Sequence, residues 1–254
     1  IALFVAEFIS ISEAVIHYIC MSKDKAPEFP VIPESEYPHV DVLIATHSEE
    51  PELLFKTING CKHMEYPDPS KVHIYLCDDN DRPEMAKLAQ KMGVGYFGLS
   101  GNKLAKAGNL NNALSKTDSP LVVTFDADMI PRSSFLMKTV PYFFLPEMIL
   151  EDGVWRKRTE EELDPDYKIG FVQTPQSFYN PDLFQFNFFA ESNIPNEQDY
   201  FFKEVNIGRN SSNSAIYAGS NTLISRRALE EVGGIRTKTI TEDFATGIDI
   251  QAKG

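Results

Sequence analysis

The sequence has few cysteines and no long run of basic residues. Its three cysteines, Cys20, Cys61 and Cys77, form no C-x-x-C pair, so no zinc site or disulfide framework is indicated and a reduced compartment fits best. Only 24 basic residues stand against 37 acidic ones, which gives a formal net charge of -13. We therefore expect no nucleic-acid partner, and an anionic substrate would need a divalent cation or a few well-placed basic side chains.

A cleaved signal peptide does not fit the amino-terminal residues, because neither a starting methionine nor a basic region precedes them. Residues 1–22 are mostly apolar and predict a helix, either the end of a transmembrane segment or an amphipathic helix on the domain or membrane surface. Residues 23–38 contain four prolines, which predicts an extended linker. One domain is then expected over residues 39–254. The chain is 43% hydrophobic, which is enough for such a domain to bury a full core.

Strand-like and helical patterns alternate along this expected domain. Apolar runs of strand length lie at Val40 to Ala45, Val72 to Leu76 and Leu121 to Phe125, and helical spacing occurs at 51–61, 82–91 and 106–115. This order predicts an α/β fold with a mostly parallel, doubly wound sheet flanked by helices. Because ligands of such sheets bind beyond the carboxyl ends of the strands, the candidate residues are the polar ones that follow them: Thr46, Glu49, Asp78, Asp79, Asp126 and Asp128.

Residues 181–202 carry many phenylalanines and tyrosines at helical spacing. We expect a helix with an aromatic face there. Packing into a core is the more common role of such a face than a platform for substrate.

Two short motifs resemble known binding loops, but the residues around them do not fit. The G-x-G-x-x-G pattern at 93–98 follows a helical run rather than a strand, which argues against a Rossmann dehydrogenase. The D-D-N-D sequence at 78–81 lacks the turn glycine and the final glutamate of a calcium loop.

Two carboxylates are better placed. Asp126 and Asp128 directly follow an apolar strand, and the alternation of side chains points both to one side of the chain. They could share Mg²⁺ or Mn²⁺, which would bind the two phosphates of a nucleotide-sugar and neutralise the charge of the leaving diphosphate. The alternative is a pair of solvated loop acids.

Further motifs resemble the processive family 2 glycosyltransferases, with cellulose synthase as the nearest likeness. The aspartates at 78–79, the D-A-D at 126–128 and the T-E-D at 241–243 resemble that family's three-part aspartate signature. The segments K-A-G-N-L-N at 106–111 and Q-T-P at 173–175 resemble cellulose synthase motifs, whereas Ala218 replaces the cysteine of the family's C-G-S motif. The resemblance covers about residues 40–253. It implies a GT-A fold on the cytoplasmic face of a membrane and a single displacement that inverts the anomeric centre.

The same resemblance implies roles for individual residues on the donor side. Thr46 and Glu49 would lie near the nucleotide, and Asp78 or Asp79 would bind its uracil or ribose end. Lys106 would lie near the nucleotide-binding loop. Asp126 would contact the diphosphate and, with Asp128, the metal.

On the acceptor side, the resemblance makes Asp243 the general base that deprotonates the acceptor hydroxyl, with Glu242 as its rival. The donor would be a UDP-sugar and the acceptor a growing β-glucan, with further synthase subunits as partners. The family's Q-x-x-R-W motif is expected beyond Gly254, so we interpret the chain as a fragment. A hyaluronan-like, chitin-like or lipid-directed transferase, or a non-catalytic nucleotide-sugar-binding module, remains an alternative.

Overall fold

The computed structural model describes residues 1–22 and 26–253, and these divide into two compact units. Unit 1 combines Ile1–Glu28 with Thr174–Ile216, and unit 2 combines Phe29–Gln173 with Tyr217–Gly254. Residues 23–25 of the predicted linker and residue 254 of the predicted domain lie outside the described residues.

Unit 2 is built on a six-stranded sheet with the strand order β3-β2-β1-β4-β8-β7. Its strands are β1 (Val40–Thr46), β2 (Val72–Asp78), β3 (Gly95–Gly98), β4 (Leu121–Asp126), β7 (Phe171–Gln173) and β8 (Thr222–Ser225). The first four strands are mutually parallel, and β8 runs antiparallel to both β4 and β7. The predicted α/β fold with a mostly parallel sheet is therefore confirmed. Each of the three predicted strands runs one or two residues further than expected, so that β2 and β4 each end on an aspartate.

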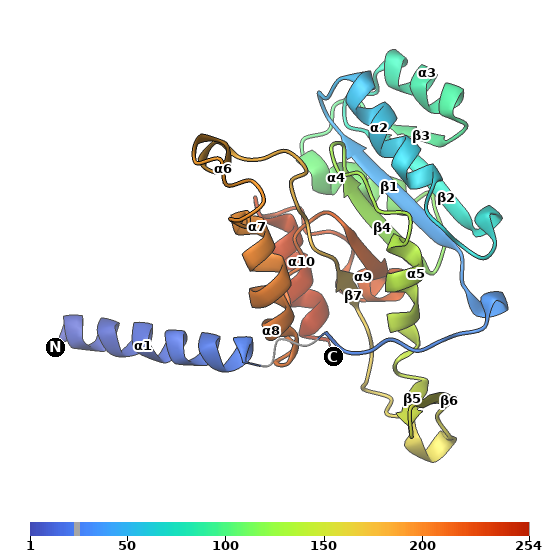
Figure 1. Ribbon diagram of the computed structural model, residues 1–254. Coiled ribbons are helices and arrows are strands. Elements are labelled where there is room, and N and C mark those ends of the chain that lie inside the picture. Colours follow the sequence, from blue (N-terminus) through green and yellow to red (C-terminus); the bar gives the residue numbers. More distant parts are fainter. Residues whose placement is uncertain (23–25, 254) are drawn as a thin grey trace. The chain divides into compact units, whose positions relative to one another are not determined.

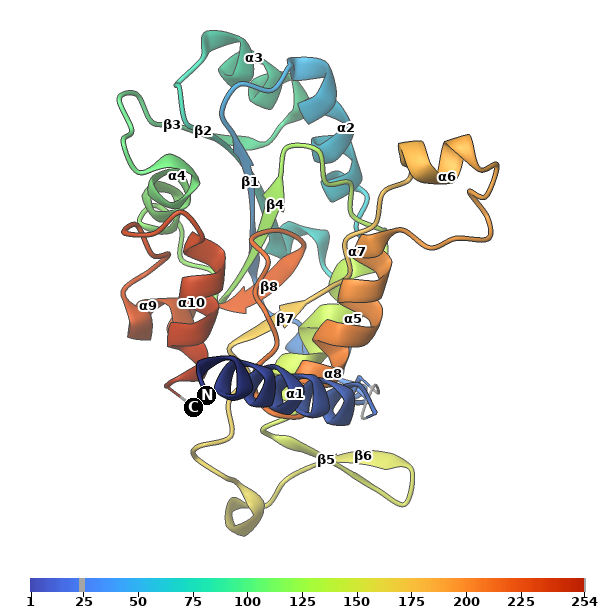
Figure 2. The same cartoon turned by 90° about the vertical axis from the view of Figure 1, so that its left-hand side faces the viewer.

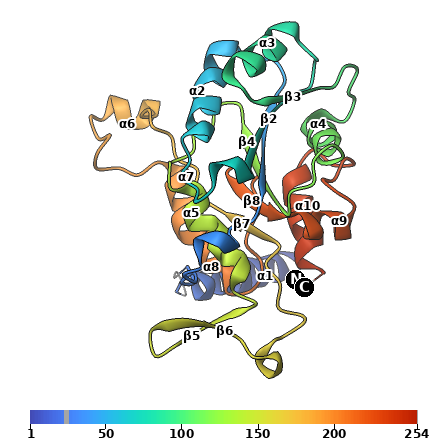
Figure 3. The same cartoon turned by 90° about the vertical axis from the view of Figure 1, so that its right-hand side faces the viewer.

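Helices cover both faces of this sheet (Figures 2 and 3). One face carries α2 (Pro51–Lys62), α3 (Pro83–Met92) and α5 (Phe135–Thr139), and the other carries α4 (Ala105–Leu114), α9 (Arg226–Val232) and α10 (Glu242–Gln251). The alternating side chains of β1 explain this: Val42 and Ile44 join the first core, whereas Leu43 joins the second. Every residue of β1 is buried, as expected for a central strand between two helical layers.

Local sequence sets the ends of the helices in the first layer. Pro51 and Pro83 occupy the first helical positions of α2 and α3, where the missing N–H of proline costs no hydrogen bond. Gly93 ends α3 in the left-handed region, with φ of 67°. The first glycine of the G-x-G-x-x-G pattern is thus a helix terminus, and β3 follows it, which agrees with the rejection of a dinucleotide-binding loop.

Smaller elements complete unit 2. A hairpin of β5 (Met148–Glu151) and β6 (Val154–Lys157) projects away from the six-stranded sheet (Figure 1). Short 3₁₀ helices lie at η1 (Glu34–Glu36), η2 (Pro69–Lys71), η3 (Val140–Phe144) and η4 (Glu160–Glu162). Ile32 and Tyr37 of the proline-rich segment are buried in the first core, so this stretch packs on unit 2.

Unit 1 contains α1 (Ala2–Met21), α6 (Leu183–Asn187), α7 (Glu197–Tyr200), the π-helical turn η5 (Phe201–Val205) and α8 (Asn206–Asn210). No residue of α1 is buried. Among the described residues, α1 is the one helix long and apolar enough to cross a membrane, a property that signal sequences and core helices share.

The predicted single helix over residues 181–202 is wrong. Turns separate α6 from α7, and Phe189 adopts a positive φ of 52°, which an α-helix does not tolerate. The expected core packing also fails for most of the aromatic residues, because Phe184, Phe186, Phe188 and Phe189 are exposed while Phe202 is buried.

Candidate active site

The carboxyl ends of the parallel strands meet at one edge of the sheet in unit 2. Thr46, the last residue of β1, pairs with Asp78, the last residue of β2, and Ala45 pairs with Asp126 at the end of β4. The antiparallel strand β8 begins at this edge, and the hydroxyl of Ser220, two residues before it, accepts a hydrogen bond from the Asp126 N–H at 2.9 Å. The predicted candidates that follow separate strands therefore lie along one edge.

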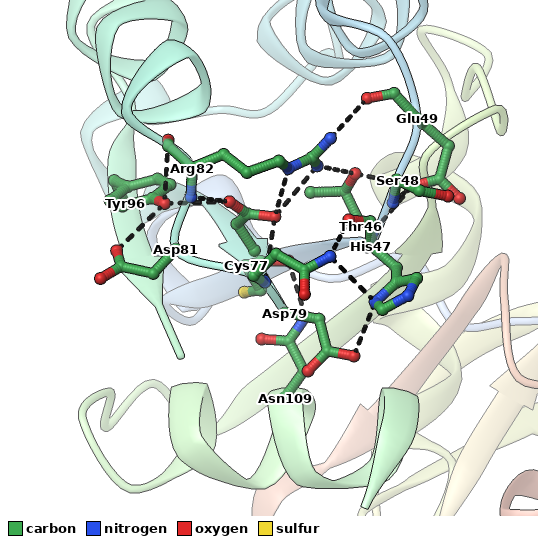
Figure 4. Close-up of polar contacts among 12 residues, drawn as sticks. Thr46, His47, Ser48, Glu49, Cys77, Asp79, Asp81, Arg82, Tyr96 and Asn109 are labelled. Atoms are coloured by element: carbon green, nitrogen blue, oxygen red, sulfur yellow. Dashed lines mark hydrogen bonds and ion pairs between the residues drawn. The ribbon is translucent and has the colours of Figure 1, made fainter. Parts of the chain in front are cut away.

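Glu49 closes the turn that follows β1 (Figure 4). One of its carboxylate oxygens accepts hydrogen bonds from the Thr46 hydroxyl at 2.7 Å and from the His47 N–H at 2.8 Å. Partial burial opposes ionisation, but the hydrogen bonds outweigh it and hold the pKa of Glu49 below its ordinary value. Glu49 is thus a fixed anion that shapes the turn.

Asp78 is fully buried and binds groups of the protein itself. Its carboxylate accepts hydrogen bonds from the Arg82 N–H at 2.5 Å, the Arg82 Nε at 3.0 Å and the Tyr96 hydroxyl at 3.1 Å. Burial, followed by the charge of Asp78, raises the pKa of Tyr96, so its phenol remains a donor. This arrangement makes Asp78 the structural member of the aspartate pair.

Asp79 lies beside the turn after β1. Its Oδ2 is 3.1 Å from Nδ1 of His47, and Asn102 donates a hydrogen bond to its other oxygen. The His47 side chain is 65% exposed, whereas that of Asp79 is 8% exposed. The pair therefore lies where the polar network reaches the surface of unit 2.

Lys106 contacts two other segments of the site. Its Nζ donates to the Gly219 carbonyl oxygen at 2.8 Å and forms an ion pair with Asp126. The helix that carries it, α4, is tied to β2 by Asn109, which donates to the Cys77 carbonyl at 2.7 Å, and to the loop after α9 by Asn111. The K-A-G-N-L-N segment thus fixes the lysine in place.

Gly219 brings Asp243 into the same group. With φ of 75°, Gly219 uses a conformation that favours glycine, and a Cβ atom there would lie 2.7 Å from the Asp243 Oδ2 and 3.3 Å from the Lys106 Nζ. Asp243 lies in the first turn of α10, and Thr241 is the N-cap residue of that helix, although no side-chain cap hydrogen bond forms. Lys106, Asp126 and Asp243, from three distant parts of the sequence, therefore meet around Gly219.

A buried tyrosine and a half-buried glutamine support this group. Tyr217 is buried next to Thr124, with 3.3 Å between the two hydroxyl oxygens. Burial is the main cause that raises the pKa of Tyr217, and the charges of Asp243 and Asp126 add to it. Gln173 at the end of β7 accepts hydrogen bonds from the Ala218 N–H and the Thr222 hydroxyl, which fixes the turn before β8.

A model of one protein family, described as "Glycosyl transferase family 2", matches residues 41–233. The chain belongs to glycosyl transferase family 2. Apart from Val40, the match includes every strand of the six-stranded sheet, and Lys106 and Asp126 lie within it.

Named relatives of this family 2 domain include cellulose synthases. The chain is 34% identical over 219 residues to cellulose synthase 1 of Komagataeibacter xylinus, covering 86% of this chain and 13% of the relative. It is 31% identical over 251 residues to the UDP-forming cellulose synthase catalytic subunit of Pseudomonas fluorescens, covering 98% of this chain and 31% of the relative. The chain thus spans less than a third of the length of these relatives, and the predicted family resemblance is confirmed.

Solved structures of glycosyltransferases share the fold. The mannosyltransferase PcManGT from Pyrobaculum calidifontis, in complex with GDP-Man and Mn²⁺, matches with a TM-score of 0.62 at 18% identity, covering 98% of this chain and 61% of that one. S. aureus TarS 1-349 in complex with UDP-GlcNAc matches with a TM-score of 0.58 at 10% identity, covering 85% and 54%. These matches confirm the predicted GT-A fold of the family 2 domain.

The carboxylates after β4 suit a cation that is shared with a substrate. Asp128 is exposed, and the Thr57 hydroxyl holds the turn by donating to the Ala127 carbonyl at 2.6 Å. Within residues 1–22 and 26–253, no group of three or more His, Cys, Asp or Glu residues is arranged to hold a metal. Two carboxylates are nevertheless the donor set with which Mg²⁺ or Mn²⁺ binds a diphosphate, because phosphate oxygens and water complete its shell.

Sequence reasoning missed several residues of this family 2 site. Arg82, Tyr96 and Asn102 all contact the aspartates after β2, yet none of them lies in a predicted site. The signal available for Arg82 was its position directly after four polar residues and before the proline that starts α3. Tyr96 and Asn102 carried no comparable signal, because only the parallel pairing of β2 with β3 brings them close.

Proposed function

We propose that this chain is the catalytic domain of an inverting glycosyltransferase that moves a sugar, glucose, from a UDP-sugar to the end of a growing β-glucan. The observation that carries this proposal is the meeting of Lys106, Asp126 and Asp243 around Gly219. Single-displacement transfer to a hydroxyl requires positive charge near the leaving group, a carboxylate that can bind a metal ion, and a second carboxylate that can act as a base. Lys106, Asp126 and Asp243 supply these three groups.

Each side chain has one task in this proposal. Asp243 accepts the proton of the acceptor hydroxyl as the new glycosidic bond forms. Lys106 places positive charge beside the diphosphate that leaves. Asp126 and Asp128 hold Mg²⁺ or Mn²⁺, which supplies further positive charge for the diphosphate when it is bound.

Donor recognition belongs to the turns after β1 and β2. Thr46 and Glu49 shape the first turn, and Asp79 with His47 forms the part of the network that reaches the surface. We assign contact with the uracil or ribose end to Asp79 rather than to Asp78, because the Asp78 carboxylate is fully buried against Arg82 and Tyr96.

The choice of glucose and of a β-glucan product rests on the relatives that are named cellulose synthases. The same three charged residues would serve a transferase for another sugar. The discriminating experiment is a transfer assay of the full-length protein in membranes with several radiolabelled nucleotide-sugars. Transfer from UDP-glucose alone into a glucan is the expected result, whereas transfer from another donor would identify a different family 2 enzyme, and no transfer would favour a binding module.

We also propose that the parent protein is integral to a membrane and presents this domain on the cytoplasmic face. The length and composition of α1 support this location, and so do the exposed phenylalanines of α6 and its flanking turn in unit 1. Resistance of the full-length protein to extraction from membranes by alkaline carbonate would test it. Complete release into the soluble fraction would contradict it.

Metal dependence gives a direct prediction for the donor site. If Asp126 and Asp128 share a cation with the diphosphate, the chain should bind UDP at least about tenfold more tightly with Mn²⁺ or Mg²⁺ than with a chelator. Asp128→Asn should remove most of that difference, as measured by calorimetry.

Asp152→Asn is the matched control, since Asp152 is also an exposed aspartate but lies in the turn of the β5–β6 hairpin. It should leave the effect of metal unchanged. Equal UDP affinity of the parent chain with and without metal would refute the cation site.

A further inference from the structure

We propose that Arg82 is a positioning residue of the donor site, whose guanidinium locks the turn after β1 to the turn after β2. In this proposal Asp78 serves as the counter-ion of Arg82. The contact between Arg82 and Asp78 in turn holds Asp79 and His47, which lie at the surface of unit 2, in place. The inference rests on the proposed function, because it assumes that these turns bind the nucleotide of the donor.

Arg82 contacts both turns through its guanidinium nitrogen atoms (Figure 4). Toward β1, its Nη1 donates to the Glu49 carbonyl oxygen and its Nη2 to the Thr46 hydroxyl, each at 2.9 Å. Toward β2, its Nε and Nη2 both lie 3.0 Å from Oδ1 of Asp78. The planar, forked guanidinium can satisfy all of these acceptors at once, which an ammonium group cannot.

The charges in this contact are removed from solvent. The Asp78 side chain is 0% exposed and that of Arg82 is 17% exposed. A buried carboxylate needs both a counter-charge and hydrogen bonds, and the Tyr96 hydroxyl supplies a further one to Asp78. The buried carboxylate of Asp78 therefore has both a counter-charge and hydrogen-bond donors.

The backbone between Asp78 and Arg82 depends on the same contact. Asp81 has a positive φ of 51°, and the carboxylate of Asp78 accepts a hydrogen bond from the Arg82 N–H, so the chain reverses within five residues. Asn80, which lies inside this turn, donates to the His47 carbonyl at 2.6 Å. Movement of the turn would therefore shift His47 and Asp79 together.

The reaction centre has independent supports. Lys106, Asp126 and Asp243 are held through Gly219, Ser220 and helices α4 and α10, which Arg82 does not contact in the hydrogen bonds described. A change at Arg82 should therefore weaken donor binding while the rate at saturating donor stays close to normal. If the role of Arg82 were purely structural, its substitution would lower the stability of the fold without changing donor binding more than the rate at saturating donor.

The test compares Arg82→Lys with Arg226→Lys. Arg226 is a matched control because its guanidinium also binds a buried aspartate, Asp41, but at the amino end of β1. Each variant would be measured for UDP affinity by calorimetry and for KM and kcat in the full-length enzyme, at a temperature where it is folded. We expect Arg82→Lys to weaken UDP binding and raise KM by about tenfold, with kcat within about twofold, because the fork to Thr46 and Glu49 is lost.

The control should keep the UDP affinity of the parent. Unchanged UDP affinity in a folded Arg82→Lys variant, or an equal loss in Arg226→Lys, would overturn the inference. Should Arg82→Lys fail to fold, Tyr96→Phe removes one hydrogen bond to Asp78 and leaves the ion pair in place. It should weaken UDP binding by a smaller factor, and unchanged affinity in it would also overturn the inference.

A readout without ligand separates this inference from the proposed function. Amide hydrogen exchange of the turn residues His47, Ser48 and Asn80 should be faster in Arg82→Lys than in the parent and unchanged in Arg226→Lys. If the parent chain fails to bind UDP, the proposed donor site is wrong, yet this exchange pattern would still show that Arg82 positions the two turns. Equal exchange in all three proteins would show that it does not.

Discussion

Asp243→Asn is expected to lower the turnover of the full-length enzyme by about a hundredfold or more while leaving its affinity for the UDP-sugar unchanged. A general base acts only as the acceptor hydroxyl loses its proton, so its removal raises the barrier without weakening donor binding. The structure places Asp243 on α10 next to Gly219, whose carbonyl oxygen accepts a hydrogen bond from Lys106, the ion-pair partner of Asp126. Steady-state rates together with calorimetric UDP affinities would measure both quantities.

Glu242→Gln is the matched control, because Glu242 is the neighbouring acid in the first turn of the same helix. It should retain most of the turnover. If Glu242→Gln is the inactive variant and Asp243→Asn is active, the base is Glu242. Near-normal turnover in both variants would place the base outside this motif.

Asp41→Ala is expected to cost about 3–5 kcal/mol of the free energy of unfolding, because it leaves the Arg226 guanidinium buried without its counter-charge. The side chains of Arg226 and Asp41 are 10% and 1% exposed, and Nη2 of Arg226 lies 2.8 Å from Oδ2 of Asp41. Ser119 donates to the same carboxylate through its N–H and its hydroxyl, so the loop before β4 and the start of α9 both lose their partner on β1. Urea denaturation of the chain would measure the loss.

The control for this prediction is Glu231→Ala, which removes the partner of Arg227 in an exposed pair on α9. Its cost should be about 1 kcal/mol or less, since an exposed ion pair is screened by water. UDP affinity should be unchanged in folded Asp41→Ala, because Asp41 lies near the amino end of the strands. An Asp41→Ala cost as small as that of Glu231→Ala would show that the buried pair contributes little.

The sequence predicted the parallel sheet well because its strands are short apolar runs between helical patterns. β1 and β4 are buried between two helical layers over almost their whole length and are therefore mostly apolar, whereas β2 is fully buried only in its last three residues. The ends of these strands then located Thr46, Asp78 and Asp126 at one edge, since parallel strands share their direction. The hairpin of β5 and β6 was not predicted because each of its strands has only four residues, although the Asp152-Gly153 turn between them is typical of a hairpin.

The aromatic segment in unit 1 shows where pattern reasoning failed. Helical spacing of phenylalanines predicted one packed helix over 181–202, but the structure has α6, a turned stretch and α7 with exposed rings. Periodicity records which side chains would share a face if the backbone were helical. It does not record whether a core is available to cover that face.

By itself the sequence determined which groups of this family 2 domain carry charge and which strand or helix each one follows or begins. These are local properties, set by side-chain chemistry and by patterns of a few residues. Only the tertiary structure decided which of the groups meet. It brought Lys106 and Asp243 together at Gly219. It also paired Arg82 with Asp78 and placed Asp79 beside His47. The physical reason is that these contacts join segments far apart in the chain, and the register and packing of the sheet bring those segments together.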